Sequence, residues 1–466
     1  MDVPKKVSRR EFVRLTGIAA GAAALAACAT PTPQVIKETV VVEKPVEKVV
    51  EKVVTPTPTP ITFTMLVETN DEIIAVQQAA INDFKQVKPW VTIKIQPGST
   101  PELNEIVPWL AAGTAPDAFR HALDRGTGWG LKNLLYDFAP FAKDVGAVDK
   151  YVEAVWKGYM WRDGQVWMLP SDTNTFCLWC NPVLFERAGV KNLMPPKTWD
   201  EMVQAAKAIA KPDPDPNKAI WGFGRPTTIG WASWWQYWWL WREGGDYYDG
   251  KNLLYKEAMI ESIKKVQFLV KENLLPAMDN WQDHWYQGRM AMQEYGQWVL
   301  PADVPGPWND NNPKGKWEAD YPRPNFVFAT MPKFRPDVPG YSILAGFGWC
   351  IPKSNKHFNE MAEYLWWHIS HPKHGQMYVT PYKQLPAVKK EVVTHPWLDH
   401  PALATFQEQL KTTKPMTVYP EVLQIIDECN PSLLINAFTG KITAEQAVEE
   451  SYKCAEPIIR EAQANR

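Results

Sequence analysis

Six tryptophans within eleven residues constrain this chain more than any other feature of its sequence. They lie in the stretch 229–245, IGWASWWQYWWLWREGG, at Trp231, Trp234, Trp235, Trp238, Trp239 and Trp241. The spacing i, i+3/i+4 and i+7 predicts a helix, and the pair Gly244 and Gly245 is a plausible helix end. A helix that carries indoles on several sides must be buried on most of them. The stretch therefore requires a large lobe around it.

The two ends of this predicted helix are interpreted separately. We expect the later four tryptophans to pack in the core. Trp231 and Trp234, near the N-terminal end, could instead face a cleft, because a flat indole packs well against the C–H face of a pyranose ring. For these two residues the sequence leaves core packing and ligand binding open.

Length and charge set the wider bounds. A chain of 466 residues has room for two or three domains. Its 45% hydrophobic and 22% charged residues are typical of a globular protein. The net charge of −2 offers no basic field for nucleic acid, so we expect no nucleic-acid partner.

The N-terminal residues resemble an export signal. SRREFVRL (8–15) carries the pair Arg9 and Arg10 ahead of a short apolar run, as in twin-arginine signals. That run is too short to remain as a membrane-spanning helix. It ends in LAAC, which resembles a lipobox with Cys28 as the lipidated residue. We therefore expect residues 1–27 to be a signal peptide and the mature protein to be extracytoplasmic, anchored to the membrane through Cys28.

Residues 28–60 are rich in Pro, Val, Lys and Glu and end in TPTPTP. Valines at positions 46, 49, 50 and 53 allow a short helix, but β-branched residues and a length of nine or ten residues make it marginal. We interpret the segment as a stalk between the lipid anchor and the folded protein.

Regular α/β alternation begins at residue 61. The pattern predicts strands at 61–68, 91–98 and 118–122, and helices at 72–87 and 103–112. This order favours an α/β sheet of parallel strands, whose ligands lie at the carboxyl ends of the strands. Residues just past two of these strands are therefore site candidates: Glu68, Thr69, Asn70, Asp124 and Arg125.

An ordered series of motifs resembles a known family. The series comprises GTAPDAF (113–119), LDRGTG (123–128), GQVWMLPSDTNTFCLWCNPVLFERAGV (164–190), MAMQEYGQW (290–298), FVFATMPKF (326–334), LAGFGWCIPKSN (344–355) and SLLINAFTGKITAEQAVEES (432–451). Together they resemble the extracellular solute-binding proteins of ABC importers, in the branch that binds maltose, other oligosaccharides and glycerophosphodiesters. The resemblance runs from residue 61 nearly to the C-terminus.

The resemblance implies a two-lobe periplasmic-binding-protein fold of type II, an α/β fold whose discontinuous lobes are joined by hinge crossings. On this basis the N-lobe comprises 61–170 and 299–350, and the C-lobe comprises 171–298 and 351–466. The first crossing is expected near 169–175. FVFATMPKF is expected to add a strand to the N-lobe, and 355–370 a helix to the C-lobe.

The resemblance also assigns polar site residues. Asp124 and Arg125 stand where sugar-binding members place an Asp-Arg pair on substrate hydroxyls, and carboxylate and guanidinium groups suit vicinal hydroxyls. Asn174 stands at the position of a hydroxyl-binding carboxylate, where an amide both donates and accepts.

Four tryptophans and a glycine complete the implied site. Trp231 and Trp234 match aromatic stacking positions, Trp298 matches the aromatic of the second crossing, and Gly346 and Trp349 belong to a GFGW element near the cleft. A further aromatic is expected where this chain has Asp427, so that platform is either missing or supplied by Tyr419 or Tyr378.

The implied function is non-enzymatic: capture of a carbohydrate by a monomeric, cofactor-free subunit that delivers it to a membrane permease. One alternative is a glycerophosphodiester or another polyol as the ligand. Another is a secreted glycoside hydrolase with Glu68 and Asp124 as its carboxylate pair, since such enzymes also use tryptophan platforms.

Three further features are secondary. Cys177 and Cys180 should point to opposite faces of a strand. Cys429 and Cys454 could bridge two C-terminal helices, although sequence leaves the pairing open among these four and Cys350. The three histidines at 368, 371 and 374 lack a metal-binding pattern, and the Pro-rich insertion 301–324 is either a cleft lid or a surface loop.

Overall fold

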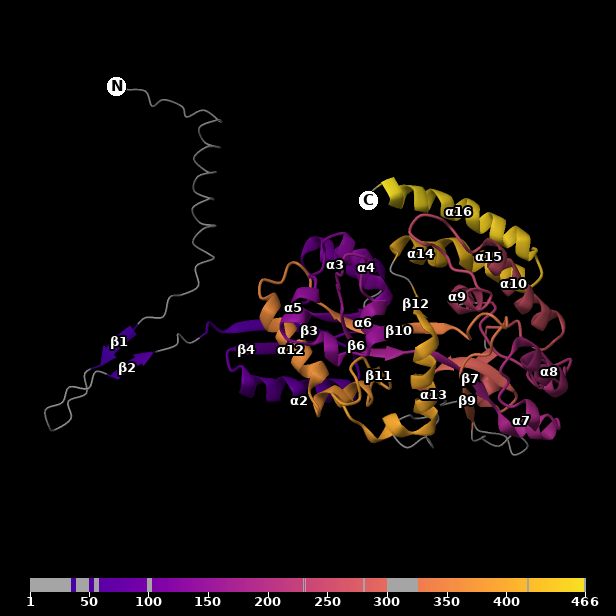
Figure 1. Ribbon diagram of the computed structural model, residues 1–466, viewed down its shortest axis with the longest axis horizontal. Coiled ribbons are helices and arrows are strands. Elements are labelled where there is room, and N and C mark those ends of the chain that lie inside the picture. The colour runs from indigo at the N-terminus through magenta and orange to yellow at the C-terminus, as the bar shows by residue number, and fades with distance from the viewer. Residues whose placement is uncertain are drawn as a thin grey trace, which may run out of the picture. The chain divides into compact units, whose positions relative to one another are not determined.

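The computed structural model describes residues 35–38, 50–53, 58–98, 103–228, 230, 232–279, 281–299, 326–416 and 419–464 (Figure 1). Cys28, the rest of the predicted signal, Trp231 and the insertion 301–324 lie outside the described residues. The chain divides into two units, residues 1–61 and residues 62–466. In the described part no helix is long and apolar enough to cross a membrane.

The first unit contains a two-stranded ribbon. Strand β1 (Val35–Glu38) pairs antiparallel with β2 (Val50–Val53), with Val35 opposite Val53. The short helix considered for the valines of this segment is therefore wrong where β2 lies. The physical reason is the one that made the helix marginal, since β-branched valines favour strands.

The second unit begins with the elements that the sequence predicts. Strand β3 (Ile61–Val67), helix α2 (Asp71–Val87), strand β4 (Val91–Pro97), helix α3 (Leu103–Ala112) and strand β5 (Phe119–Ala122) follow in that order. Strands β3 and β4 pair with each other, and a parallel bridge joins Met65 to Ala118. The predicted boundaries are confirmed to within about one residue.

The sheet that contains β6 (Leu169–Asn174) and β10 (Ser342–Cys350) has mixed rather than parallel strands. Its order is β11 (Leu385–Pro386), β6, β10 and β12 (Thr413–Pro415), and β5 also pairs with β10. Strand β10 runs antiparallel to β5 and β6 and parallel to β12. The parallel order expected from the first strands does not extend to this sheet, because β10 returns from the far half of the sequence and inserts between earlier strands.

A second, antiparallel sheet is built around β7 (Phe176–Cys180). Strand β7 lies between β8 (Met292–Gly296) and β9 (Val327–Ala329) and is antiparallel to both. Only Thr175 separates β6 from β7, so the chain passes from one sheet to the other at the predicted first crossing. The Ser342 hydroxyl, at the start of β10, donates to the carbonyl of Phe176 at 2.9 Å. This bond ties two crossing segments together.

Helices cover both sheets (Figure 1). Around the first sheet lie α4 (Gly126–Leu131), α5 (Ala139–Asp144), α6 (Glu153–Gly158) and α12 (Phe358–Ser370). The rest are α7 (Pro182–Arg187), α8 (Trp199–Ile209), α9 (Ala232–Arg242), α10 (Lys256–Lys271), α11 (Trp281–Tyr286), α13 (Pro401–Gln409), α14 (Pro420–Gln424), α15 (Asn430–Phe438) and α16 (Ala444–Ala464). Short 3₁₀ turns are η1 (Leu123–Arg125), η2 (Val148–Lys150), η3 (Lys191–Leu193), η4 (Gln297–Val299), η5 (His374–Tyr378), η6 (Pro396–Asp399) and η7 (Leu410–Thr412).

The tryptophan-rich stretch forms α9, which is buried along nearly its whole length. Trp239 and Trp241 are fully buried, as expected of core residues. Trp234 is half-buried, which sets it apart from the tryptophans that follow it in the helix.

Two elements pack against partners that the expected lobe assignment does not give them. Strand β9, within FVFATMPKF, pairs with β7 and so belongs to the second sheet. Helix α12 packs against α2, where Tyr364 meets Phe84 with ring centroids 5.1 Å apart. In each case the sequence shows an apolar face but not the surface that covers it. The exact lobe boundaries remain a prediction, since residues 62–466 form one unit.

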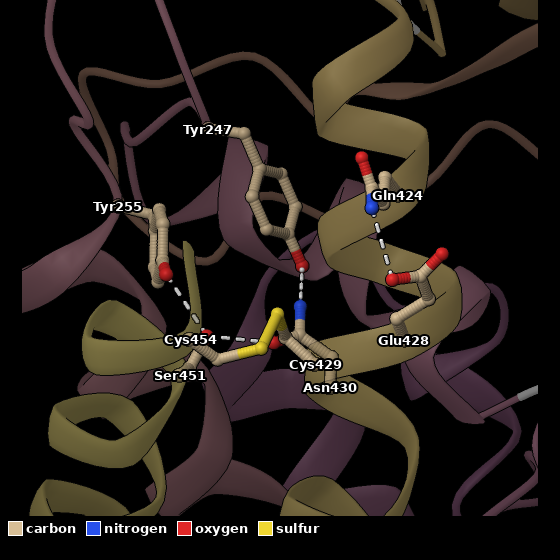
Figure 2. Close-up of a disulfide and its surroundings, with 8 residues drawn as sticks. All are labelled: Tyr247, Tyr255, Gln424, Glu428, Cys429, Asn430, Ser451 and Cys454. Atoms are coloured by element: carbon tan, nitrogen blue, oxygen red, sulfur yellow. Dashed lines mark hydrogen bonds between the residues drawn. A yellow bond between two sulfur atoms is a disulfide. The ribbon is translucent and has the colours of Figure 1, made fainter. Parts of the chain in front are cut away.

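The cysteines follow two patterns. Cys429 and Cys454 form a disulfide that joins a π-helical turn, η8 (Ile425–Cys429), to α16 (Figure 2). Cys177 and Cys180 are buried in β7 and pack in separate apolar clusters, which confirms that they face opposite ways. Cys350 is also free and buried. Within the described residues no group of His, Cys, Asp and Glu could hold a metal ion.

Candidate ligand-binding site

A cavity of about 640 Å³ lies where residues from the two sheets meet. Aromatic rings dominate its lining: Tyr159, Phe176, Trp234, Trp235, Trp238, Trp281, Tyr295, Trp298 and Phe347. The polar lining is smaller: His121, Asp124, Arg125, Asn174, Asp279, Gln282 and Gln384. This volume and composition are those of a site for a small organic ligand.

The aromatic wall is built around Phe176, the first residue of β7. Its ring stacks on Trp238 with centroids 4.7 Å apart and planes at 29°. Trp235 and Trp298 meet the same ring edge-on, at 4.9 and 5.1 Å. Such packing fixes ring orientation, so the wall presents rigid faces to a ligand.

Asp124 and Arg125 enter the cavity from η1, directly after β5. Nε of Arg125 lies 3.2 Å from Oδ2 of Asp124, and Nη1 lies 2.8 Å from Oδ2 of Asp427. The guanidinium carbon is 5.2 Å from the centroid of the Trp234 indole, a cation–π arrangement. Arg125 therefore joins the two sides of the cavity.

Asp124 is a poised hydrogen-bond acceptor. Burial raises the pKa of its carboxyl, and the neighbouring Arg125 opposes that shift. Oδ2 of Asp124 is buried and is ion-paired with Nε of Arg125, without a hydrogen bond of good geometry in the described part of the chain. Because Asp124 also lines the cavity, its carboxylate can accept from a ligand hydroxyl.

Neutral polar groups line the remaining wall. Asn174 ends β6 opposite Ala345, and its side chain reaches the cavity. The ring of His121 accepts a hydrogen bond from the Ala122 backbone through Nδ1 at 2.8 Å. Gln384 accepts from Gln297 at 3.2 Å. Amide and imidazole groups of this kind can both donate and accept.

Five of the predicted site residues line the cavity along with Asp124. They are Arg125, Asn174, Trp234, Trp298 and Gly346. Gly346 has φ of 150°, and a Cβ there would lie 2.4 Å from the Asp172 carbonyl oxygen. Only glycine allows β10 to approach β6 this closely beside the cavity.

Three predicted site residues do not line this cavity. Glu68 is held in an ion pair with Arg120 at 2.6 Å and accepts from Tyr382 at 2.9 Å. Asn70 caps helix α2 by accepting from two backbone N–H groups of the first turn. Trp349 is fully buried and donates to the hydroxyl of Tyr378.

Neither tyrosine named as a substitute for the missing aromatic, Tyr378 or Tyr419, lies at the cavity. Tyr378 is buried behind Trp349, and Tyr419 bonds to Arg162. At the position in question the chain instead supplies the carboxylate of Asp427, which pairs with Arg125.

Several lining residues were missed or assigned only to the core. Trp235 and Trp238 were expected in the core, and they are buried there, but each also presents part of its ring to the cavity. Phe176 follows the crossing strand directly, which was an available signal. Tyr295 lies in the MAMQEYGQW motif, so a signal was available for it. Trp281 carried none, since its placement depends on packing between α11 and β8, where its ring meets Tyr295 with centroids 6.1 Å apart.

The fold and its ligand-sized cavity define a two-lobe solute-binding protein. The sequence profile of the family described as bacterial extracellular solute-binding protein matches residues 69–367, more than half of the chain. The chain belongs to this family. Its extracellular description agrees with the extracytoplasmic location expected from the N-terminal residues.

One curated relative is the sn-glycerol-3-phosphate-binding periplasmic protein UgpB of Agrobacterium fabrum (strain C58), 28% identical over 146 residues. That match covers 30% of this chain, and the chain spans about a third (33%) of the length of that relative.

Solved structures show the same fold. The substrate-binding protein Lmo0181 of Listeria monocytogenes, in complex with cycloalternan, has a TM-score of 0.68 at 16% identity over 86% of this chain and 99% of that one. The sugar-binding protein MalE of Xanthomonas citri has a TM-score of 0.67 at 19% identity over 86% and 98%. The cyclic α-maltosyl-1,6-maltose binding protein of Arthrobacter globiformis has 0.67 at 17% over 86% and 100%.

Proposed function

We propose that this protein binds a carbohydrate between its lobes, without chemical conversion, and delivers it to the membrane permease of an ABC importer. The observation that carries the proposal is the cavity of about 640 Å³ with nine aromatic side chains and a small polar set in its lining. Indole and phenyl faces suit the C–H faces of sugar rings, and Asp124, Arg125 and Asn174 suit their hydroxyls.

The proposal extends to location. The family is extracellular, and the paired arginines and LAAC sequence before Cys28 favour an exported, lipid-anchored protein. Mass spectrometry of the mature protein tests this part: a diacylglyceryl group on Cys28 supports the anchor, and an intact residue 1–27 segment on the exported chain contradicts it.

The hydrolase alternative loses its supporting geometry. It needs Glu68 and Asp124 as a pair across a glycosidic bond. Glu68 is committed to Arg120 and Tyr382 and does not line the cavity.

The test is a thermal-shift panel of mono- and oligosaccharides on the full chain. A ligand at 100 times its dissociation constant adds about 2.7 kcal/mol to the free energy of unfolding. Reducing ends are assayed in the same mixtures; their release with turnover would favour the hydrolase. No shift with any carbohydrate would contradict the proposal.

A matched pair of variants places binding in the cavity. Trp234→Ala removes a half-buried indole that faces Arg125, and we expect at least about a tenfold loss of affinity, roughly 1.4 kcal/mol. Trp90→Ala removes a half-buried indole beside Lys88, away from the cavity, and should leave affinity unchanged. Equal effects of the two substitutions would place the ligand elsewhere.

A further inference from the structure

The one guanidinium group in the described cavity lining is held between two acids. Arg125 contacts Asp124 through Nε at 3.2 Å and Asp427 through Nη1 at 2.8 Å. Its side chain is 15% exposed, so these contacts are screened less than surface pairs. The indole of Trp234 covers one face of the same group.

Asp427 lies in a segment that a disulfide and hydrogen bonds hold in place. It lies in the π-helical turn η8, a kind of turn that often occurs at functional sites. Two residues later, Cys429 forms the disulfide to Cys454 in α16 (Figure 2). The next residue, Asn430, donates to the hydroxyl of Tyr247 at 2.9 Å and accepts from Ser451 at 2.7 Å. These bonds fix the backbone on the C-terminal side of Asp427.

The charges around the cavity add to a negative balance. Arg125 carries one positive charge, and Asp124 and Asp427 carry two negative charges. Asp279 adds a further carboxylate to the lining. No lysine or second arginine is among the described lining residues. A phosphate or carboxylate entering this site would meet a guanidinium already paired, and carboxylates that repel it.

We propose that Asp427 sets the charge specificity of the cavity: by pairing with Arg125 it excludes ligands that carry a phosphate or carboxylate, and leaves the site to polyols without an anionic group. The inference rests on the proposed function and narrows its substrate class. It also decides against a glycerophosphate ligand at this site, although a curated relative is named for binding one.

The test is to remove the charge of Asp427 and measure anion binding by titration calorimetry. The probes are glycerol 3-phosphate and inorganic phosphate, with glycerol as the uncharged counterpart. In Asp427→Asn the guanidinium loses one partner, and we expect glycerol 3-phosphate to bind at least about tenfold more tightly than to the wild type, the value of one charge-assisted hydrogen bond. Glycerol affinity should not change.

The chain offers a matched control one residue away. Glu428 is exposed and accepts a hydrogen bond from Gln424 at 3.0 Å (Figure 2). The acids paired with Arg125 are Asp124 and Asp427. Glu428→Gln removes the same charge from the same turn and should leave anion affinity as in the wild type. Equal gains in the two variants would reduce the effect to net charge and overturn the inference.

Two more outcomes separate this inference from the proposed function. Adding Arg125→Ala to Asp427→Asn should abolish the gained anion affinity, which identifies Arg125 as the group released. The inference is refuted if the wild type binds glycerol 3-phosphate tightly. It is also refuted if Asp427→Asn or Asp427→Ser, with an unchanged melting temperature, gains no affinity for glycerol 3-phosphate. If no carbohydrate shifts the melting temperature while Asp427→Asn still gains affinity for glycerol 3-phosphate, the proposed function alone is refuted.

Discussion

Substituting Glu294 tests whether the core of the tryptophan-rich lobe depends on one buried acid. Glu294, in β8, is fully buried. Its Oε2 accepts from the indole N–H groups of Trp238 and Trp239 at 2.8 and 2.9 Å. Its Oε1 accepts from Nη2 of Arg242 at 2.5 Å, and Arg242 is also fully buried. Burial lowers the pKa of Arg242, and the Glu294 charge opposes that shift.

We expect Glu294→Gln to lower the free energy of unfolding by about 3–5 kcal/mol, because it leaves the Arg242 charge buried without its partner. For a unit of about 400 residues the entropy of unfolding is roughly 0.85 kcal/mol/K, so the melting temperature should fall by about 4–6 °C. Differential scanning calorimetry at neutral pH measures the shift.

The double variant supplies the control. Glu294→Gln with Arg242→Met removes both charges, and it should be more stable than Glu294→Gln alone because the Arg242 guanidinium is no longer stranded. The buried Arg225 loses the Glu294 charge in both variants, so it does not affect this comparison. A Glu294→Gln protein that melts within 1 °C of the wild type, at the precision of the calorimeter (roughly the shift for 1 kcal/mol), would refute the reasoning. So would a double variant less stable than either single one.

Three further predictions concern pH, the disulfide and the backbone beside the cavity. Burial lowers the pKa of His368 from 6.5 to about 3, so below pH 6.5 the unfolded chain takes up a proton that the native chain does not. Between pH 7 and pH 5 the wild type should therefore lose about 2 kcal/mol more unfolding free energy than His368→Gln. Urea unfolding measures both losses, and equal losses would contradict this prediction. Replacing Cys429 and Cys454 by Ala opens a loop of 25 residues and should lower the free energy of unfolding by about 3.5 kcal/mol in the same assay. A decrease below about 1 kcal/mol would contradict the loop-entropy argument. Gly346→Ala would place Cβ 2.4 Å from a backbone oxygen and should cost about 1–3 kcal/mol, whereas Gly230→Ala, where nothing lies within 4 Å, should be nearly neutral in a thermal melt.

Local periodicity made residues 61–122 predictable. Residues 61–122 alternate strand and helix with clear apolar faces, and β3, α2, β4 and α3 form close to the predicted positions. The same information failed for β9 and α12. Their apolar faces are evident, but which lobe covers them is decided by strand pairing and helix packing between residues far apart in the chain.

The site was predictable where motif and chain position agree. Asp124 and Arg125 follow β5, so the resemblance and the strand-end rule name the same two residues. Asn174, which the resemblance alone names, ends β6. Glu68 also satisfies the rule but does not line the cavity, because its carboxylate pairs with Arg120, 52 residues away. Trp349 lies past the register shift between Phe347 and Gly348 in β10, and there it is fully buried with its indole N–H donated to Tyr378 rather than directed at the cavity.

Core and cavity share one helix, and this limits how stability and ligand affinity can be varied separately. Trp238 lines the cavity with its ring while Glu294 fixes its indole N–H from behind. A change at Glu294 should therefore alter both the folded state and the wall that a ligand meets. Trp234 is half-buried and contacts Arg125, so its loss should reduce affinity with little effect on the core. If Trp234→Ala destabilised the protein as much as Glu294→Gln, the division of α9 into a ligand-facing end and a core would be wrong.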